Sequence, residues 1–160
     1  MRCVDTARAW LDGFVNAPAQ PGTQPVSLPG DLSGDFTGEF VRHLGIRITE
    51  VTGDRIVAEW EAAAKHHQPY GIVHGGVHCS VVETLASVGA ATWLGEKGQV
   101  VGVNNNTDFY RAVREGGLTS TATPVHRGRL QQVWAVETVD SEGRVVARGQ
   151  VRLQNLYPQG

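Results

Sequence analysis

The chain has little that would tie it to a membrane, to nucleic acid or to a disulfide framework. Its 160 residues include only two cysteines, Cys3 and Cys79, so we expect no disulfide framework and a reducing, cytoplasmic location. The 14 basic and 16 acidic residues nearly cancel, which leaves no general attraction to nucleic acid or to an anionic membrane. The most apolar stretch, residues 75–95, contains Glu83 and is too short and too polar to span a bilayer. The first residues carry charges where a signal peptide needs an apolar run.

The first 40 residues differ in character from the rest of the chain. Apolar residues recur at helical spacing over residues 3–16, which predicts a short amphipathic helix. Residues 13–30 carry four prolines and no charged side chain, a composition that prevents regular helix and favours an extended connector. We therefore predict an N-terminal helix and Pro/Gly-rich connector over residues 1–40 and a single domain over residues 41–160.

The rest of the chain predicts an α+β domain. Alternating apolar residues indicate strands, whereas the length, the alanines and the apolar spacing of residues 75–94 indicate a long helix. Because this helix is apolar on nearly every side, it must be covered on nearly every side. We expect a single antiparallel sheet to wrap around it and a second subunit to cover what remains. The predicted strands are residues 44–51, 55–62, 99–110, 117–126, 131–139 and 145–154.

Glu83 is the charged residue that this helix does not explain. No other Asp, Glu, Lys or Arg occurs between Lys65 and Glu96, and the positions one turn away offer no basic partner. Burying a carboxylate costs several kcal/mol unless it is paired or protonated. Composition alone leaves two interpretations open: Glu83 is used chemically, or it reaches a gap filled with solvent.

The glycines at the start of the same helix suggest an oxyanion site. Gly75 and Gly76 place unpaired N–H groups and the positive end of the helix dipole where a ligand can approach closely. The alternative is a Gly-rich helix start that binds no ligand, which has the same sequence pattern. Gly75 and Glu83 are about 12 Å apart along one helix at about 1.5 Å per residue. Both must reach one carbonyl and its water. A catalytic interpretation therefore predicts a dimer in which Gly75 of one chain faces Glu83 of the other.

The histidines offer a metal site as an alternative. His74 and His78 are four residues apart and share a helix face, as zinc ligands can. A third ligand is missing unless His66 or His67 completes the set. We therefore predict no metal, a packed or interfacial His78, and a His74 that lies near a ligand carbonyl.

The run from Gln68 to Gly76 (QPYGIVHGG), with Glu83 nine residues after His74 and Ser87 four later, resembles hotdog-fold acyl-CoA thioesterases. The similarity is greatest to the phenylacetate-degradation type and to its 4-hydroxybenzoyl-CoA and enterobactin-pathway relatives. It extends over residues 40–154. The resemblance implies a hotdog fold, hydrolysis of acyl-CoA without a cofactor, and homodimers, often paired into tetramers, whose sites span two chains.

The resemblance also implies a role for each matched residue. Glu83 would act as general base on water or as nucleophile on the thioester carbonyl. The N–H of Gly75 would polarise that carbonyl, assisted by His74. Gln68 would orient the carbonyl or the water, and Ser87 would hold the water or the carboxylate.

CoA carries three phosphates, and the resemblance assigns them to the turn Arg127-Gly128-Arg129, where arginine suits bidentate phosphate binding. An exposed hairpin tip is the alternative. The polar run at residues 104–106 we interpret as an exposed strand edge rather than as a contact to a polar acyl group. A non-catalytic acyl-CoA-binding module stays open as a second function, because a fold alone does not settle function.

Overall fold

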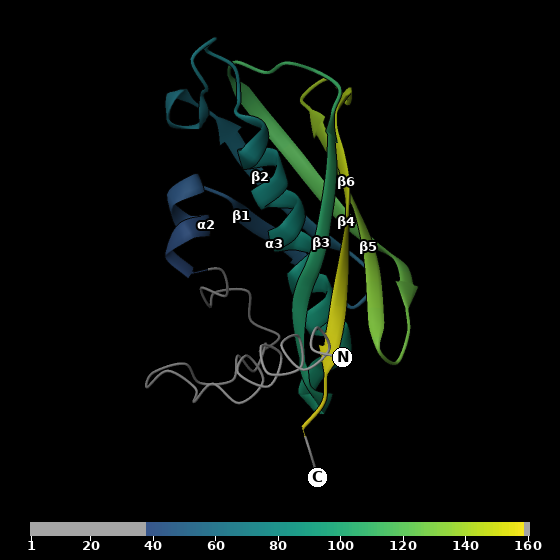
Figure 1. Cartoon of the computed structure of the whole chain (residues 1–160). Coiled ribbons are helices and arrows are strands. Elements are labelled where there is room, and N and C mark those ends of the chain that lie inside the picture. Colours follow the sequence, from purple (N-terminus) through teal and green to yellow (C-terminus); the bar gives the residue numbers. More distant parts are fainter. Residues whose placement is uncertain (1–37, 159–160) are drawn as a thin grey trace, which may run out of the picture.

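The computed structural model describes residues 38–158 and consists of helices and a single sheet (Figure 1). The predicted N-terminal helix and connector lie outside the described residues. In chain order the elements are α2 (Gly38–Leu44), β1 (Arg47–Val51), β2 (Ile56–Ala62), the 3-10 turn η1 (Ala64–His66), α3 (Gly75–Leu94), the 3-10 turn η2 (Gly95–Lys97), β3 (Gln99–Phe109), β4 (Gly116–Arg127), β5 (Gln131–Asp140) and β6 (Val145–Leu156).

The six predicted strands are confirmed, and they form one antiparallel sheet in the order β1-β2-β4-β5-β6-β3. The first strand begins at Arg47 rather than at residue 44, because the short helix α2 continues to Leu44. Helix α2 was not predicted. Its Val41 and Leu44 are buried, so this segment belongs to the core of the domain and spans the predicted boundary at residue 40.

Helix α3 lies along one face of the sheet with β3 beside it, which confirms the expected hotdog arrangement (Figure 1). Only one of its faces is buried, at the spacing of three and four residues that one side of a helix requires. The opposite face is half-buried in a single chain, and it is the part of the helix that the sequence analysis expected a second subunit to cover. The buried residues are His78, Val81, Val82, Leu85, Ala86, Gly89, Ala90 and Leu94.

The helix approaches the sheet most closely at Gly89. A Cβ atom at this position would lie 2.5 Å from the ring of Trp134, which is fully buried on β5. The indole N–H of Trp134 donates to Gln132 Oε1 at 3.0 Å, and Gln132 Nε2 donates to the carbonyl of Ala90 at 3.2 Å. This packing fixes the height and rotation of α3 above the sheet. Within residues 38–158, no helix combines the length and the apolar character needed to cross a bilayer.

Candidate active site

The start of α3 presents a free backbone donor. His74 caps the helix, and its Nδ1 accepts a hydrogen bond from the N–H of Gly76 at 2.8 Å. The N–H of Val77 donates to the carbonyl of His74 at 2.9 Å. The N–H of Gly75 has no acceptor within residues 38–158. One unpaired donor at the positive end of a 20-residue helix is therefore available to a ligand oxygen.

The loop before α3 is held by contacts from several directions. Gln68 Oε1 accepts from the N–H of Tyr70 at 2.6 Å, which folds the loop back on itself. Gly71 adopts a φ of 72°, a left-handed conformation that suits glycine. Arg114 Nη1 donates to the carbonyls of Tyr70 and Gly71 at 3.1 and 3.0 Å. The predicted residues Gln68 and His74 therefore belong to a loop whose conformation is fixed by hydrogen bonds.

Phe109 and His78 surround the first turn of α3. A Cβ atom on Gly75 would lie 2.7 Å from the ring of Phe109, so this glycine allows the ring to lie directly on the helix start. The Phe109 ring also lies against His78, tilted by 35° with ring centroids 5.9 Å apart, and His78 meets Trp60 edge-on at 5.6 Å. His78 is only 4% exposed and its Nδ1 has no hydrogen-bond partner. Burial lowers its pKa to about 4. The predicted packed histidine is confirmed.

Glu83 lies half-buried on α3 beside the edge strand β3. The sequence predicted a carboxylate enclosed by apolar side chains, but in a single copy of the chain it is only half-buried. It also predicted no basic partner. The partner is an amide: Asn105 Nδ2 donates to Glu83 Oε2 at 3.0 Å. The other carboxylate oxygen, Oε1, lies against Gly102, where any Cβ atom would overlap it.

Gly75, Glu83 and Ser87 all lie on the unbroken helix α3. Ser87 is half-buried, follows Glu83 by one turn, and has no hydrogen bond from its side chain within the described part of the chain. Helix α3 is uninterrupted from Gly75 to Leu94. The eight-residue separation of Gly75 and Glu83 therefore corresponds to about 12 Å along its axis. One chain therefore does not bring these two groups to the same carbonyl.

Asn105 and Gly102 are the site residues that the sequence analysis missed. The polar run at residues 104–106 was interpreted as an exposed edge, and β3 is indeed an edge strand of the sheet. Asn104 and Asn106 are exposed, as that interpretation requires, but Asn105 is half-buried and faces Glu83. A usable signal was Gly102, because an isolated glycine inside a strand indicates a bulge or a close approach.

The predicted phosphate-binding turn connects β4 to β5. Arg127 is already paired: its Nη1 lies 2.8 Å from Asp54 Oδ1 and donates to the carbonyl of Gly53 at 2.7 Å. Its guanidinium also lies over the ring of Trp93, 5.5 Å from the centroid. Gly128 permits the tight turn, since a Cβ atom there would lie 2.7 Å from His126 Nε2. Arg129 is exposed and makes no ion pair with any described residue.

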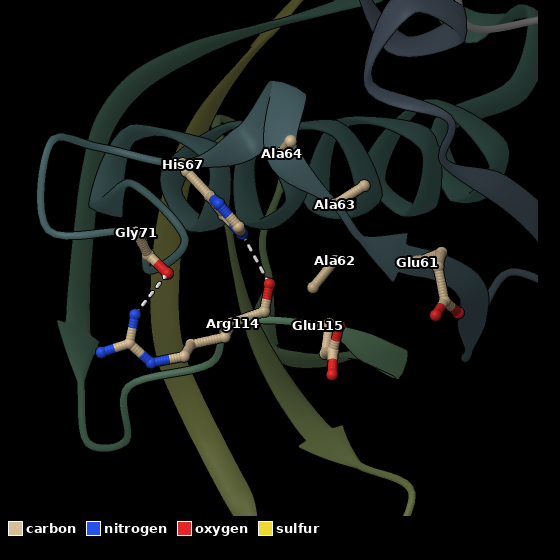
Figure 2. Close-up of a pocket in the computed structure, with 8 residues that line it drawn as sticks. All are labelled: Glu61, Ala62, Ala63, Ala64, His67, Gly71, Arg114 and Glu115. Carbon is tan, nitrogen blue, oxygen red and sulfur yellow. Dashed lines mark hydrogen bonds between the residues drawn. The ribbon is translucent and has the colours of Figure 1, made fainter.

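A pocket of about 590 Å³ lies beside the same loop, whose His67 and Gly71 help to line it (Figure 2). His67 Nε2 donates to the carbonyl of Arg114 at 2.5 Å, and the Arg114 side chain reaches Gly71, as the dashed lines of Figure 2 show. None of the predicted catalytic residues lines this pocket. Its walls are Glu61, Ala62, Ala63, Ala64, His67, Gly71, Arg114 and Glu115.

Comparison with known proteins places this architecture in a family. The family model described as the thioesterase superfamily matches residues 70–147. The Mycobacterium tuberculosis candidate esterase Rv1847 is 53% identical over 116 residues, which cover 71% of this chain and 83% of that protein. The proofreading thioesterase EntH of Klebsiella pneumoniae is 40% identical over 106 residues, which cover 65% of this chain and 76% of that protein.

Solved structures show the same fold. The crystal structure of AziG from S. sahachiroi is 57% identical with a TM-score of 0.75, and covers 76% of this chain and 99% of its own. The thioesterase HI1161 of Haemophilus influenzae is 33% identical with a TM-score of 0.71, covering 76% of this chain and 85% of its own. The E. coli PaaI protein of the phenylacetic acid degradation operon is 22% identical with a TM-score of 0.68, over 73% of this chain and 83% of its own. At that distance it shows a common fold alone, and the specific likeness to the phenylacetate-degradation type stays a prediction.

Proposed function

Because this chain belongs to the thioesterase superfamily and is an enzyme of that class, we propose that it hydrolyses an acyl-CoA thioester to a free carboxylic acid and CoA. The observation that supports this most is that α3 carries two groups: a free backbone N–H at Gly75, and the carboxylate of Glu83, which the side-chain amide of Asn105 holds in place. Hydrolysis of a thioester needs both: a donor for the oxygen that becomes negative, and a base or nucleophile for the carbonyl carbon.

In the proposed reaction, the thioester oxygen accepts a hydrogen bond from the N–H of Gly75. His74 caps the helix through Nδ1 and keeps this donor aimed outward. Glu83 either removes a proton from water as that water attacks the carbonyl carbon, or attacks the carbon itself to form an anhydride that water then cleaves. Either route breaks the C–S bond and releases the thiol of CoA. Gln68 and Ser87 would orient the carbonyl and the water.

The proposed site is shared between two copies of this chain. Gly75 and Glu83 are too far apart along α3 to act on one carbonyl, but two antiparallel helices related by a two-fold axis bring each Gly75 to the partner's Glu83. Two features of the surface favour such a contact. Strand β3 is an edge strand of 11 residues that exposes Val103 and Phe109, with the exposed Tyr110 directly after it, and long exposed edge strands are normally covered. The half-buried face of α3 lies directly beside it.

For the phosphates of CoA, the proposal assigns Arg129 rather than Arg127 as the main cation. Arg127 already neutralises Asp54, whereas Arg129 is exposed on the turn that Gly128 makes possible. The backbone of this turn is fixed by Asn155, whose Nδ2 donates to the carbonyls of Gly128 and Arg129 at 3.0 and 3.1 Å. Arg129→Ala should therefore raise KM for an acyl-CoA several-fold and leave KM for the matching acyl-pantetheine, which lacks the nucleotide, unchanged.

The function is tested by incubating the purified protein with a panel of aryl, short branched and medium-chain acyl-CoA compounds while free thiol is measured. At least one compound should release CoA, and Glu83→Gln should lower kcat by at least about 10³-fold on it because the base or nucleophile is gone. The variant should bind the same compound as the wild type does. Binding of acyl-CoA without thiol release from any compound would favour a sensor instead.

A further inference from the structure

We infer that Asn105 is a positioning residue for the carboxylate of Glu83, and that a bulge in β3 exists in this chain to place it there. The inference deepens the proposed function and rests on it. Asn105 Nδ2 donates to Glu83 Oε2 at 3.0 Å and to the carbonyl of Cys79 at 3.1 Å. It thereby links the reacting side chain to the backbone of the helix one turn earlier.

The orientation of the Asn105 amide is determined by its neighbours. Thr107 Oγ1 donates to Asn105 Oδ1 at 2.7 Å, which leaves Nδ2 facing the two acceptors. The reverse orientation would set Oδ1 against a carbonyl and a carboxylate, three acceptors with no proton between them. Thr107 lies opposite Gly149 of β6, so close that a Cβ atom on Gly149 would lie 2.6 Å from Thr107 Oγ1. In this chain of hydrogen bonds, Thr107 therefore donates to Asn105 and Asn105 donates to Glu83.

The bulge explains how this strand reaches Glu83 twice. In a regular strand, side chains three residues apart point to opposite faces. The register of β3 against β6 passes from Gly102↔Leu153 to Asn104↔Arg152, so Val103 is the extra residue. Gly102 and Asn105 consequently both face α3. Gly102 leaves room for Glu83 Oε1, and Asn105 holds Oε2, so that one oxygen is fixed and the other has only a glycine beneath it.

This arrangement does more than fill space. A leucine at position 105 would fit the same half-buried volume and would pack against α3, but it would leave Glu83 free to rotate. A fixed carboxylate matters because a reacting group displaced by about 1 Å can lose about 10²-fold in rate.

The test compares Asn105→Leu and Thr107→Val with the wild type on a compound that the enzyme hydrolyses. Asn105→Leu should lower kcat roughly 10- to 100-fold with KM changed less than about threefold, since substrate contacts remain. Thr107→Val, which is nearly isosteric, should lower kcat less, by below about tenfold. In both variants kcat should fall while KM stays close to that of the wild type, because Asn105→Leu removes the donor to Glu83 and Thr107→Val removes the contact that orients that donor. Asn105→Asp should lower kcat at least as much as Asn105→Leu, because a second carboxylate would repel Glu83 instead of donating to it.

Matched controls separate positioning from folding. Asn104→Asp adds the same charge to the same strand on its exposed face, and Thr92→Val removes a similar hydroxyl from α3, where Thr92 Oγ1 donates to the carbonyl of Val88. Neither should change kcat by more than about twofold. If Asn105→Leu keeps the kcat of the wild type while Glu83→Gln is inactive, the positioning role is wrong and the proposed function stands. If Glu83→Gln is itself active, the proposed function fails first. Should Asn105→Leu not fold, Thr107→Val decides alone, and a kcat equal to that of the wild type in that variant overturns the inference.

Discussion

The two faces of α3 do different work. The face toward the sheet is made of apolar residues and one buried histidine, packed so closely that Gly89 leaves no room for a methyl group against Trp134. The opposite face carries small side chains around Glu83 and stays half-buried. The difference indicates that residues on one face of α3 stabilise the fold and that residues on the other face serve the proposed reaction. Substitutions on the packed face should change the free energy of unfolding, and substitutions on the half-buried face or at the helix start should change kcat.

The sharpest way to test the functional side is to remove the N–H of Gly75 without disturbing the helix. Gly75→Pro does this, because proline is well accepted at the first helical position and His74 already has the extended conformation that precedes proline. We expect kcat to fall roughly 10²- to 10³-fold, about 3–4 kcal/mol, with an unchanged midpoint of unfolding.

Gly75→Ala is the matched control for that change, since it adds a Cβ atom toward the exposed ring of Phe109 but keeps the N–H. Its kcat should stay within about tenfold of the wild type. Equal losses in the two variants would mean that bulk near Phe109, rather than the missing donor, limits the reaction.

The packed face should show itself in the pH dependence of stability through His78. Burial lowers the pKa of this histidine to about 4 from an ordinary value of 6.5. The unfolded chain therefore binds a proton that the folded chain does not, and stability is lost as the pH falls from about 6.5 to about 4. The full loss amounts to about 3 kcal/mol. Urea unfolding of the wild type and of His78→Gln at pH 7.5, 5.5 and 4 measures it.

His43→Gln, on the exposed side of α2, serves as the control and should follow the wild type. His78→Gln should flatten the curve. Parallel curves for the wild type and His78→Gln would show that His78 takes up its proton without opposing folding.

The smallest expected effect on this face is the addition of one methyl group at Gly89. In an exposed helix, glycine to alanine stabilises by about 0.5–1 kcal/mol. Gly89→Ala should instead destabilise by about 1–3 kcal/mol, because its Cβ atom would overlap the immobile ring of Trp134. Gly117→Ala, whose Cβ atom would meet only Glu61 at 3.6 Å, should change the midpoint little. A stabilised Gly89→Ala would mean that α3 stands further from the sheet.

The strands that the sequence predicted well are those that bury alternate side chains. Strands β2 and β6 alternate buried and exposed residues along most of their length, so the period of two was visible. Strand β3 buries little, and the bulge at Val103 breaks its alternation, so the inward direction of Asn105 could not be read from spacing. Helix α2 has seven residues, too few for a periodic signal, and its stability depends on the packing of Val41 and Leu44.

The candidate site also contains residues that local sequence signals indicated and residues that they did not. The proposed catalytic residues around Glu83 and the helix start were visible because charge and glycine stand out in an apolar run, and those residues lie close together in the sequence. The partners of Glu83 and Arg127 were not visible, because they come from distant segments: Asn105 is 22 residues from Glu83, and Gly53 is 74 residues from Arg127. No local pattern records such contacts.

The measurement that tests the account most directly mixes two inactive variants. Glu83→Gln and Gly75→Pro are co-expressed with different tags, and the hybrid is purified through both. In a hybrid dimer with shared sites, one site keeps Gly75 from one chain and Glu83 from the other, so activity should return to roughly a quarter to a half of the wild type. If the hybrid is no more active than its parents, the two groups do not meet across a subunit interface, and the shared-site mechanism is wrong.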